Sequence, residues 1–99
     1  MNITLNRNEN ELTVVLEGRL DTLTAPELEE QLEPAIEDIE KLIFDFEKLE
    51  YISSAGLRVL LSAAKGTDSQ GGEMIVKNVR PEVMEIFEVT GFADILTIE

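Results

Sequence analysis

Histidine, cysteine and tryptophan are all absent from this chain of 99 residues. Without cysteine there is no disulfide framework and no thiolate ligand for zinc, so nothing indicates an oxidising compartment. Without histidine the chain lacks the commonest general base and the commonest metal ligand. Catalytic arrangements of the Ser-His-Asp and Cys-His kinds are therefore excluded.

Positive charge is also scarce, because 8 lysines and arginines stand against 21 aspartates and glutamates, for a formal net charge of -13. A protein that binds a nucleic-acid duplex must neutralise several phosphates, and an anionic membrane repels an acidic protein. We therefore expect neither nucleic acid nor a membrane as a partner. The acidity either favours a partner that carries positive charge or only keeps a small domain soluble.

Long hydrophobic runs are missing too, since no apolar run exceeds four residues. A membrane-spanning helix needs about 20 such residues. The first residues, Met1–Leu5, become polar too early for a secretory signal, so we expect a cytoplasmic protein. With 43% hydrophobic residues the chain can build one core, and we expect a single domain over residues 1–99.

Strand-like and helix-like patterns alternate along the chain. Residues 4–16 predict a β-hairpin with a polar turn over 6–10, and Gly18 is expected to close its second strand. Buried strands are predicted at 42–46, 74–76 and 95–98. One helix is predicted before the first of these strands, one between the first and the second, and one between the second and the third. The order is β-β-α-β-α-β-α-β, which indicates an α/β fold with a mostly parallel sheet of four to five strands and an antiparallel edge strand.

Local signals make these helices specific enough to test. Thr24, followed three residues later by Glu27, predicts a capping box at the start of the first helix. Apolar residues from Ala25 to Ile39 indicate one helical face, which Pro34 should kink or interrupt. Gly91 should cap the end of the third helix.

Ser53 and Ser54 lie where a strand-following loop enters the second helix. The N-terminus of a helix has unpaired N–H groups and the positive end of the helix dipole, so a serine hydroxyl can cap it and a phosphate there is stabilised. Serine at such a position is most often only a cap. A phosphate would add about -1.5 to -2 charges and change a surface, not the fold. Both interpretations stay open from these residues alone.

The ten residues 52–61, Ile-Ser-Ser-Ala-Gly-Leu-Arg-Val-Leu-Leu, resemble the signature of STAS domains, especially of bacterial anti-sigma factor antagonists. Other landmarks of that family agree in order, and they lie within the segments Gly18–Leu28, Gly71–Val76 and Pro81–Gly91. The resemblance covers nearly the whole chain, from about residue 2 to residue 98. It implies a single STAS-like α/β domain.

The resemblance also implies a binding switch without enzymatic activity, cofactor or metal of its own. Antagonists of this family bind a serine-kinase anti-sigma factor and free the sigma factor that it holds. The kinase phosphorylates a serine of the motif with ATP, and a metal-dependent serine phosphatase restores the antagonist. The partner-binding residues that the resemblance implies are Asp21, Thr22, Ser53, Ser54, Gly56 and Arg58.

The motif departs from the usual Asp-Ser-Ser/Thr-Gly-Leu form of the family. Aligned on Gly56, the family aspartate falls on Ser53, the usual serine on Ser54, and the third hydroxyl position on Ala55. Ala55 has no hydroxyl, so Ser54 is the expected phosphorylation site and Ser53 the second choice. The missing aspartate motivates an alternative, a STAS adaptor in a signalling or transport assembly that is not phosphorylated.

Two other residues each have a plain and a functional interpretation. Asp21 follows the second strand, and because functional groups gather at the carboxyl ends of strands it is expected near Ser53; it could equally be a helix cap. Arg58 either contacts a partner or a phosphate, or is simply solvated. An enzyme that uses Ser54 as nucleophile is disfavoured, because the chain has no Gly-x-Ser-x-Gly elbow and a pair with Lys48 or Lys65 would lack a third member.

Overall fold

A computed structural model describes residues 1–99. Its elements are β1 (Asn2–Asn8), β2 (Glu11–Leu20), α1 (Ala25–Ala35), β3 (Lys41–Ile52), α2 (Ser54–Ser69), β4 (Glu73–Lys77), α3 (Pro81–Thr90), the short 3-10 helix η1 (Phe92–Asp94) and β5 (Thr97–Ile98). The strands form one sheet in the order β1-β2-β3-β4-β5. Only β1 and β2 are antiparallel, so the predicted element order and the mostly parallel sheet with an antiparallel edge strand are confirmed.

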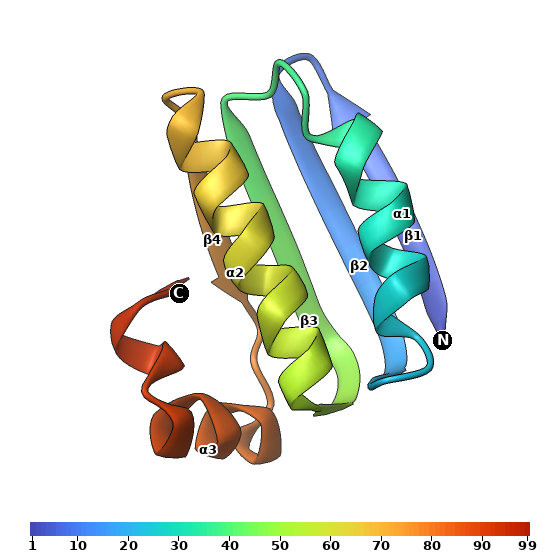
Figure 1. Cartoon of the computed structure of the whole chain (residues 1–99), viewed down its shortest axis with the longest axis vertical. Coiled ribbons are helices and arrows are strands. Elements are labelled where there is room, and N and C mark those ends of the chain that lie inside the picture. The colour runs from blue at the N-terminus through green and yellow to red at the C-terminus, as the bar shows by residue number, and fades with distance from the viewer.

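The helices lie on one face of this sheet. The strand order advances in one direction, and right-handed crossovers between parallel neighbours then carry every connecting helix to the same side. Figure 1 shows α1 and α2 side by side in front of the sheet, with α3 near one end. On the opposite face, Ile43 of β3 pairs with Ile75 of β4, and both lie outside the main hydrophobic cluster.

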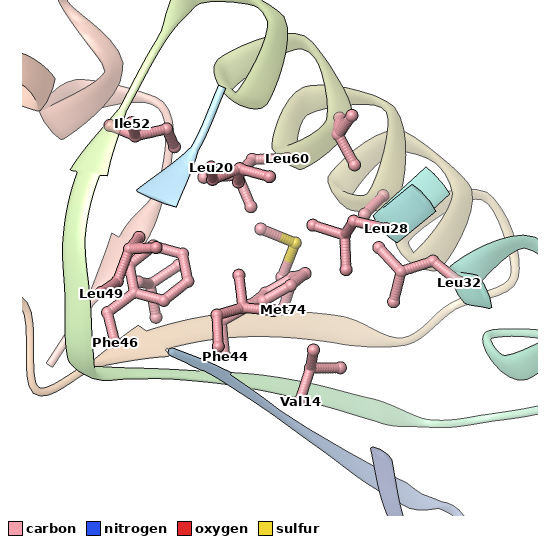
Figure 2. Close-up of a cluster of buried hydrophobic side chains, with 14 of the residues drawn as sticks. Val14, Leu20, Leu28, Leu32, Phe44, Phe46, Leu49, Ile52, Leu60 and Met74 are labelled. Carbon is pink, nitrogen blue, oxygen red and sulfur yellow. The ribbon is translucent and has the colours of Figure 1, made fainter. Parts of the chain in front are cut away.

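The core fills the space between the sheet and the helices. Figure 2 shows Phe44 of β3 beneath Leu28 of α1 and Leu60 of α2, and all three are fully buried. Phe46 contacts Phe87 of α3, with ring centroids 6.3 Å apart. Burial of such a side chain contributes about 1.5–3 kcal/mol relative to leaving it exposed. These contacts hold the three helices on the sheet.

The first four strands are longer than the apolar pattern predicts, whereas β5 covers only Thr97–Ile98 of the predicted 95–98. β3 covers 12 residues, Lys41–Ile52, because its second half carries exposed charged side chains that end the apolar run without ending the strand. β2 continues past Gly18 to Leu20, since Gly18 adopts φ 112° beside a register shift and so lets the strand bulge. The hairpin turn is only Glu9 and Asn10, with the strands running up to Asn8 and on from Glu11. Both β2 and β3 therefore extend to the same edge of the sheet.

The first helix ends beside Pro34, in agreement with the interruption expected at that residue. α1 stops at Ala35, one residue after Pro34, and no helix resumes before β3. Ile39 is buried, yet it reaches the core from a turn in which Asp38 has φ 64°, not from a helical face. Gly91 has φ 83° at the C-cap of α3, as predicted. None of the helices combines the length and apolarity that a membrane crossing requires.

Candidate functional site

The second helix starts directly at the carboxyl ends of β2 and β3. Leu20 and Ile52 are register partners at the ends of these parallel strands, and the Ser53 N–H donates to the Leu20 carbonyl at 2.9 Å. The next residue, Ser54, is the first of α2. Asp21 follows Leu20, so the β2–α1 loop and the start of α2 lie at one edge of the sheet.

Gly56 allows the first turn of α2 to sit tightly on these strand ends. A Cβ atom at Gly56 would lie 2.7 Å from Leu20 Cγ and 2.8 Å from Ile52 Cγ1. Both neighbours are buried and have no room to withdraw. Gly56 is itself buried, so it serves the site as a packing residue and offers no surface to a partner, in contrast to the partner-binding role expected from the motif.

The two serines of the motif have different surroundings. Ser53 is the N-cap of α2, with φ -101° and ψ 177°, but its side chain makes no capping hydrogen bond. Its Oγ is buried without a hydrogen-bond partner. Ser54 is exposed, and Ala55 beside it is only partly exposed. Ser54 is therefore the hydroxyl that a large protein can reach.

The β2–α1 loop is ordered by Asp21. Its Oδ1 accepts hydrogen bonds from the backbone N–H groups of Leu23, at 3.0 Å, and Thr24, at 3.2 Å. Thr24 Oγ1 accepts from the Asp21 N–H and donates to the Arg19 carbonyl, both at 2.8 Å. The predicted capping box is wrong, because this hydroxyl is used inside the loop and does not cap α1.

These contacts shift the titration of Asp21. Partial desolvation raises the pKa of the carboxyl group, while the hydrogen bonds from Leu23 and Thr24 and the positive charge of Arg19 lower it. The net effect is a pKa below the ordinary value. The Arg19 guanidinium lies 4.0 Å from the carboxylate and 4.3 Å from the centre of the Tyr51 ring. Asp21 therefore acts as an ionised group that orders the loop.

An exposed leucine at the tip of this loop was not expected. Leu23 is 87% exposed, more than any other large hydrophobic residue of the chain. It stands between Thr22 and Thr24 and belongs to no strand or helix pattern, which is the one sequence signal that marks it. Its backbone N–H donates a hydrogen bond to Asp21 Oδ1, which fixes the loop. Leu23 thus adds an exposed apolar side chain to an otherwise polar edge.

A shallow hollow connects the loop to α2. It measures about 450 Å³ and lies between α1 and α2, with Thr22, Glu29, Arg58 and Ser62 among its lining residues. Arg58 is exposed and forms no ion pair or hydrogen bond. The hollow is open, and no hydrogen bond joins its carboxylate, Glu29, to a hydroxyl group of its lining, which suits surface recognition better than catalysis.

The STAS domain family model matches residues 2–99, nearly the full chain. The chain belongs to the STAS domain family. The anti-sigma-B factor antagonist of Bacillus subtilis is 32% identical over 98 residues, which cover 99% of this STAS domain and 90% of that protein.

Solved structures with the same fold include an anti-sigma factor antagonist in two states. SpoIIAA in its unphosphorylated form superposes with a TM-score of 0.79 at 19% identity, covering 99% of this STAS domain and 87% of that chain. The phosphorylated form of SpoIIAA from Bacillus gives a TM-score of 0.78 at 20% identity, covering 99% and 91%. At this identity the likeness establishes the fold of the STAS domain.

The structure gathers at one sheet edge the residues singled out from the sequence, Asp21, Thr22, Ser53, Ser54, Gly56 and Arg58. Thr22, Ser54 and Arg58 are exposed. The other three residues, at positions 21, 53 and 56, are partly or fully buried. Of the two lysines considered as a base for Ser54, Lys48 pairs with Glu17 at 4.0 Å. Lys65 lies eleven residues, or about 16 Å of helix, beyond Ser54.

Proposed function

We propose that this STAS domain is an anti-sigma factor antagonist. It binds a serine-kinase anti-sigma factor through the edge formed by the β2–α1 loop and the start of α2, and phosphorylation of Ser54 ends the binding. The kinase transfers the γ-phosphoryl group of ATP to Ser54 Oγ, with release of ADP and the hydroxyl proton. A metal-dependent serine phosphatase hydrolyses the phosphoester and restores the binding form.

One observation carries the proposal: the two adjacent serines differ, with Ser54 exposed at the first position of α2 and the Ser53 hydroxyl buried. A kinase must bring ATP to the hydroxyl, so Ser54 is the acceptor that we favour over Ser53. The family relationship to the anti-sigma-B factor antagonist supports the partner class. The loop and hollow beside Ser54 provide the contact surface.

The location explains how a phosphate would act. At the N-terminus of α2 the free N–H groups and the helix dipole favour a negative charge, so the modified chain keeps its fold. A chain with a net charge of -13 changes little in total charge when one phosphate is added. The effect on a partner must therefore be local, through repulsion and desolvation at the contact.

The first test is the mass of the protein purified from its own bacterium. We expect a fraction heavier by one phosphate group, with the modified peptide mapped to Ser54. Ser54→Ala should abolish that fraction, and Ser53→Ala should leave it unchanged. Phosphate that persists at full level in the Ser54→Ala protein contradicts the assignment.

The second test compares partners captured from the same cells by wild type and by Ser54→Asp. We expect the wild-type protein to retain a kinase-like anti-sigma factor that the Asp variant loses. Ser69→Asp, at an exposed serine in the last position of α2 and outside the hollow, is the matched control and should retain it. Identical partners for wild type and Ser54→Asp, with no phosphate on the protein, would favour the adaptor without phosphorylation.

A further inference from the structure

Arg58 stands out among the positive charges of this acidic chain. Five of the 8 lysines and arginines have a hydrogen bond or an ion pair, namely Arg7, Arg19, Lys41, Lys48 and Arg80. Arg58 has neither, although it is exposed on α2 among 21 acidic residues. The only other cations without such a partner are Lys65 and Lys77.

Helix geometry places Arg58 one turn after Ser54 on the same face of α2. Ser54 and Arg58 are four residues apart on α2, so their side chains are neighbours on one face of the helix. Long side chains in a helix lean toward its N-terminus, which directs the Arg58 guanidinium back to the first turn. Arg58 also lines the hollow between α1 and α2 together with Ala55, the residue next to Ser54.

The charges around this pair leave the guanidinium available. The first turn of α2 carries no acidic residue, whereas the first turns of α1 and α3 carry Glu27 and Glu82. From the elements packed nearby, Glu29 of α1 lines the same hollow and Asp21 lies in the adjoining loop. Neither carboxylate forms an ion pair with Arg58, and that of Asp21 lies 4.0 Å from Arg19.

We propose that Arg58 is the internal partner of a phosphate on Ser54. When Ser54 is phosphorylated, the guanidinium donates hydrogen bonds to the phosphate oxygens, in the forked geometry that arginine forms with phosphate. One modification then changes the surface twice, because it adds a dianion at Ser54 and removes a free cation from the binding edge. This inference rests on the proposed phosphorylation of Ser54 and adds the group that receives the phosphate.

The test installs phosphoserine at position 54 during translation, so that no kinase is needed. The second pKa of the phosphate, ordinarily about 6, is followed by phosphorus NMR across neutral pH. We expect Arg58→Gln to raise this pKa by about 0.5, because a nearby cation favours the dianion. Lys65→Gln removes an equally unpaired cation from the same helix and should leave it unchanged.

Two further measurements separate a direct pair from a general field. Arg58→Lys should keep part of the lowered pKa, since it retains the charge without the fork. The difference between wild type and Arg58→Gln should shrink at about 1 M salt, where screening acts within about 3 Å. Circular dichroism of each variant checks that the fold is intact.

The proposal is overturned when phosphorylated wild type and Arg58→Gln titrate alike, or when Lys65→Gln shifts the pKa as much as Arg58→Gln does. Either result would leave the proposed switch at Ser54 unaffected. Conversely, an absence of phosphate on Ser54 in the cell would refute the proposed function without altering this titration.

Discussion

Replacing Gly56 by alanine tests the tight seat of α2 on the sheet edge. The added Cβ would approach three side-chain atoms of Leu20 and Ile52 at 2.7 to 3.0 Å. Two of these are Leu20 Cγ and Ile52 Cγ1, which lie close to the backbone and so do not move as freely as terminal methyl groups. Since Leu20 is 0% and Ile52 1% exposed, relief requires a shift of the helix itself.

The expected magnitude combines two opposing effects. Overpacking of a well-filled core costs about 1–3 kcal/mol. Alanine in a helix is favoured over glycine by about 1 kcal/mol, which offsets part of that cost. We expect Gly56→Ala to lower the free energy of unfolding by about 1 kcal/mol, with a melting temperature lower by about 4–8 °C for a domain of this size.

Gly66, in the same helix, provides the matched control. A Cβ there would meet only Ile36 Cδ1, at 3.3 Å, and this terminal methyl group can yield. Gly66→Ala should therefore gain about 0.5–1 kcal/mol from helix propensity. Urea unfolding followed by far-UV circular dichroism measures both variants. If Gly56→Ala is as stable as Gly66→Ala, the close-packing explanation of Gly56 is wrong.

Three other substitutions have defined outcomes. Ser53→Ala should change the free energy of unfolding by less than about 0.5 kcal/mol, because its Oγ has no hydrogen-bond partner; a loss of about 1 kcal/mol, normal for a serine cap, would contradict this. Asp21→Ala should lower the melting temperature at neutral pH. Because the folded-state pKa is lowered, that stabilisation is present above the ordinary pKa and is lost as pH falls through the folded value, so the gap to wild type should close in acid. A gap that persists in acid would mean that the charge of Asp21 is irrelevant. Glu9→Asn should raise the free energy of unfolding by about 0.5 kcal/mol, because asparagine adopts the φ of 56° found at Glu9 more readily than glutamate does. Urea unfolding measures this change, and a lower free energy of unfolding for the variant would contradict the prediction.

The two ends of α1 show where local sequence patterns mislead. The apolar spacing from Ala25 to Ile39 is compatible with one long helix, but the chain turns at Asp38 and brings Ile39 into the core by another path. Thr24 likewise has the sequence context of a cap, yet its hydroxyl bonds within the loop that Asp21 orders. In both cases a local turn or loop that the helical pattern does not describe decided the outcome.

Sequence patterns alone determined the order of strands and helices, the single domain and the position of the serine motif at a helix start. Each of these depends on alternation, helical spacing and turn residues, which act over a few neighbouring positions. The exclusion of histidine and cysteine chemistry needed only the composition.

Tertiary structure decided which serine is accessible and why position 56 is a glycine. The Ser53 hydroxyl is buried because α2 packs directly on the ends of β2 and β3, and Gly56 makes that packing possible. The surroundings of Arg58, which lines a hollow with Thr22 and Glu29, also depend on residues far away in sequence. Such contacts join residues more than thirty positions apart, and no local pattern in the chain encodes them.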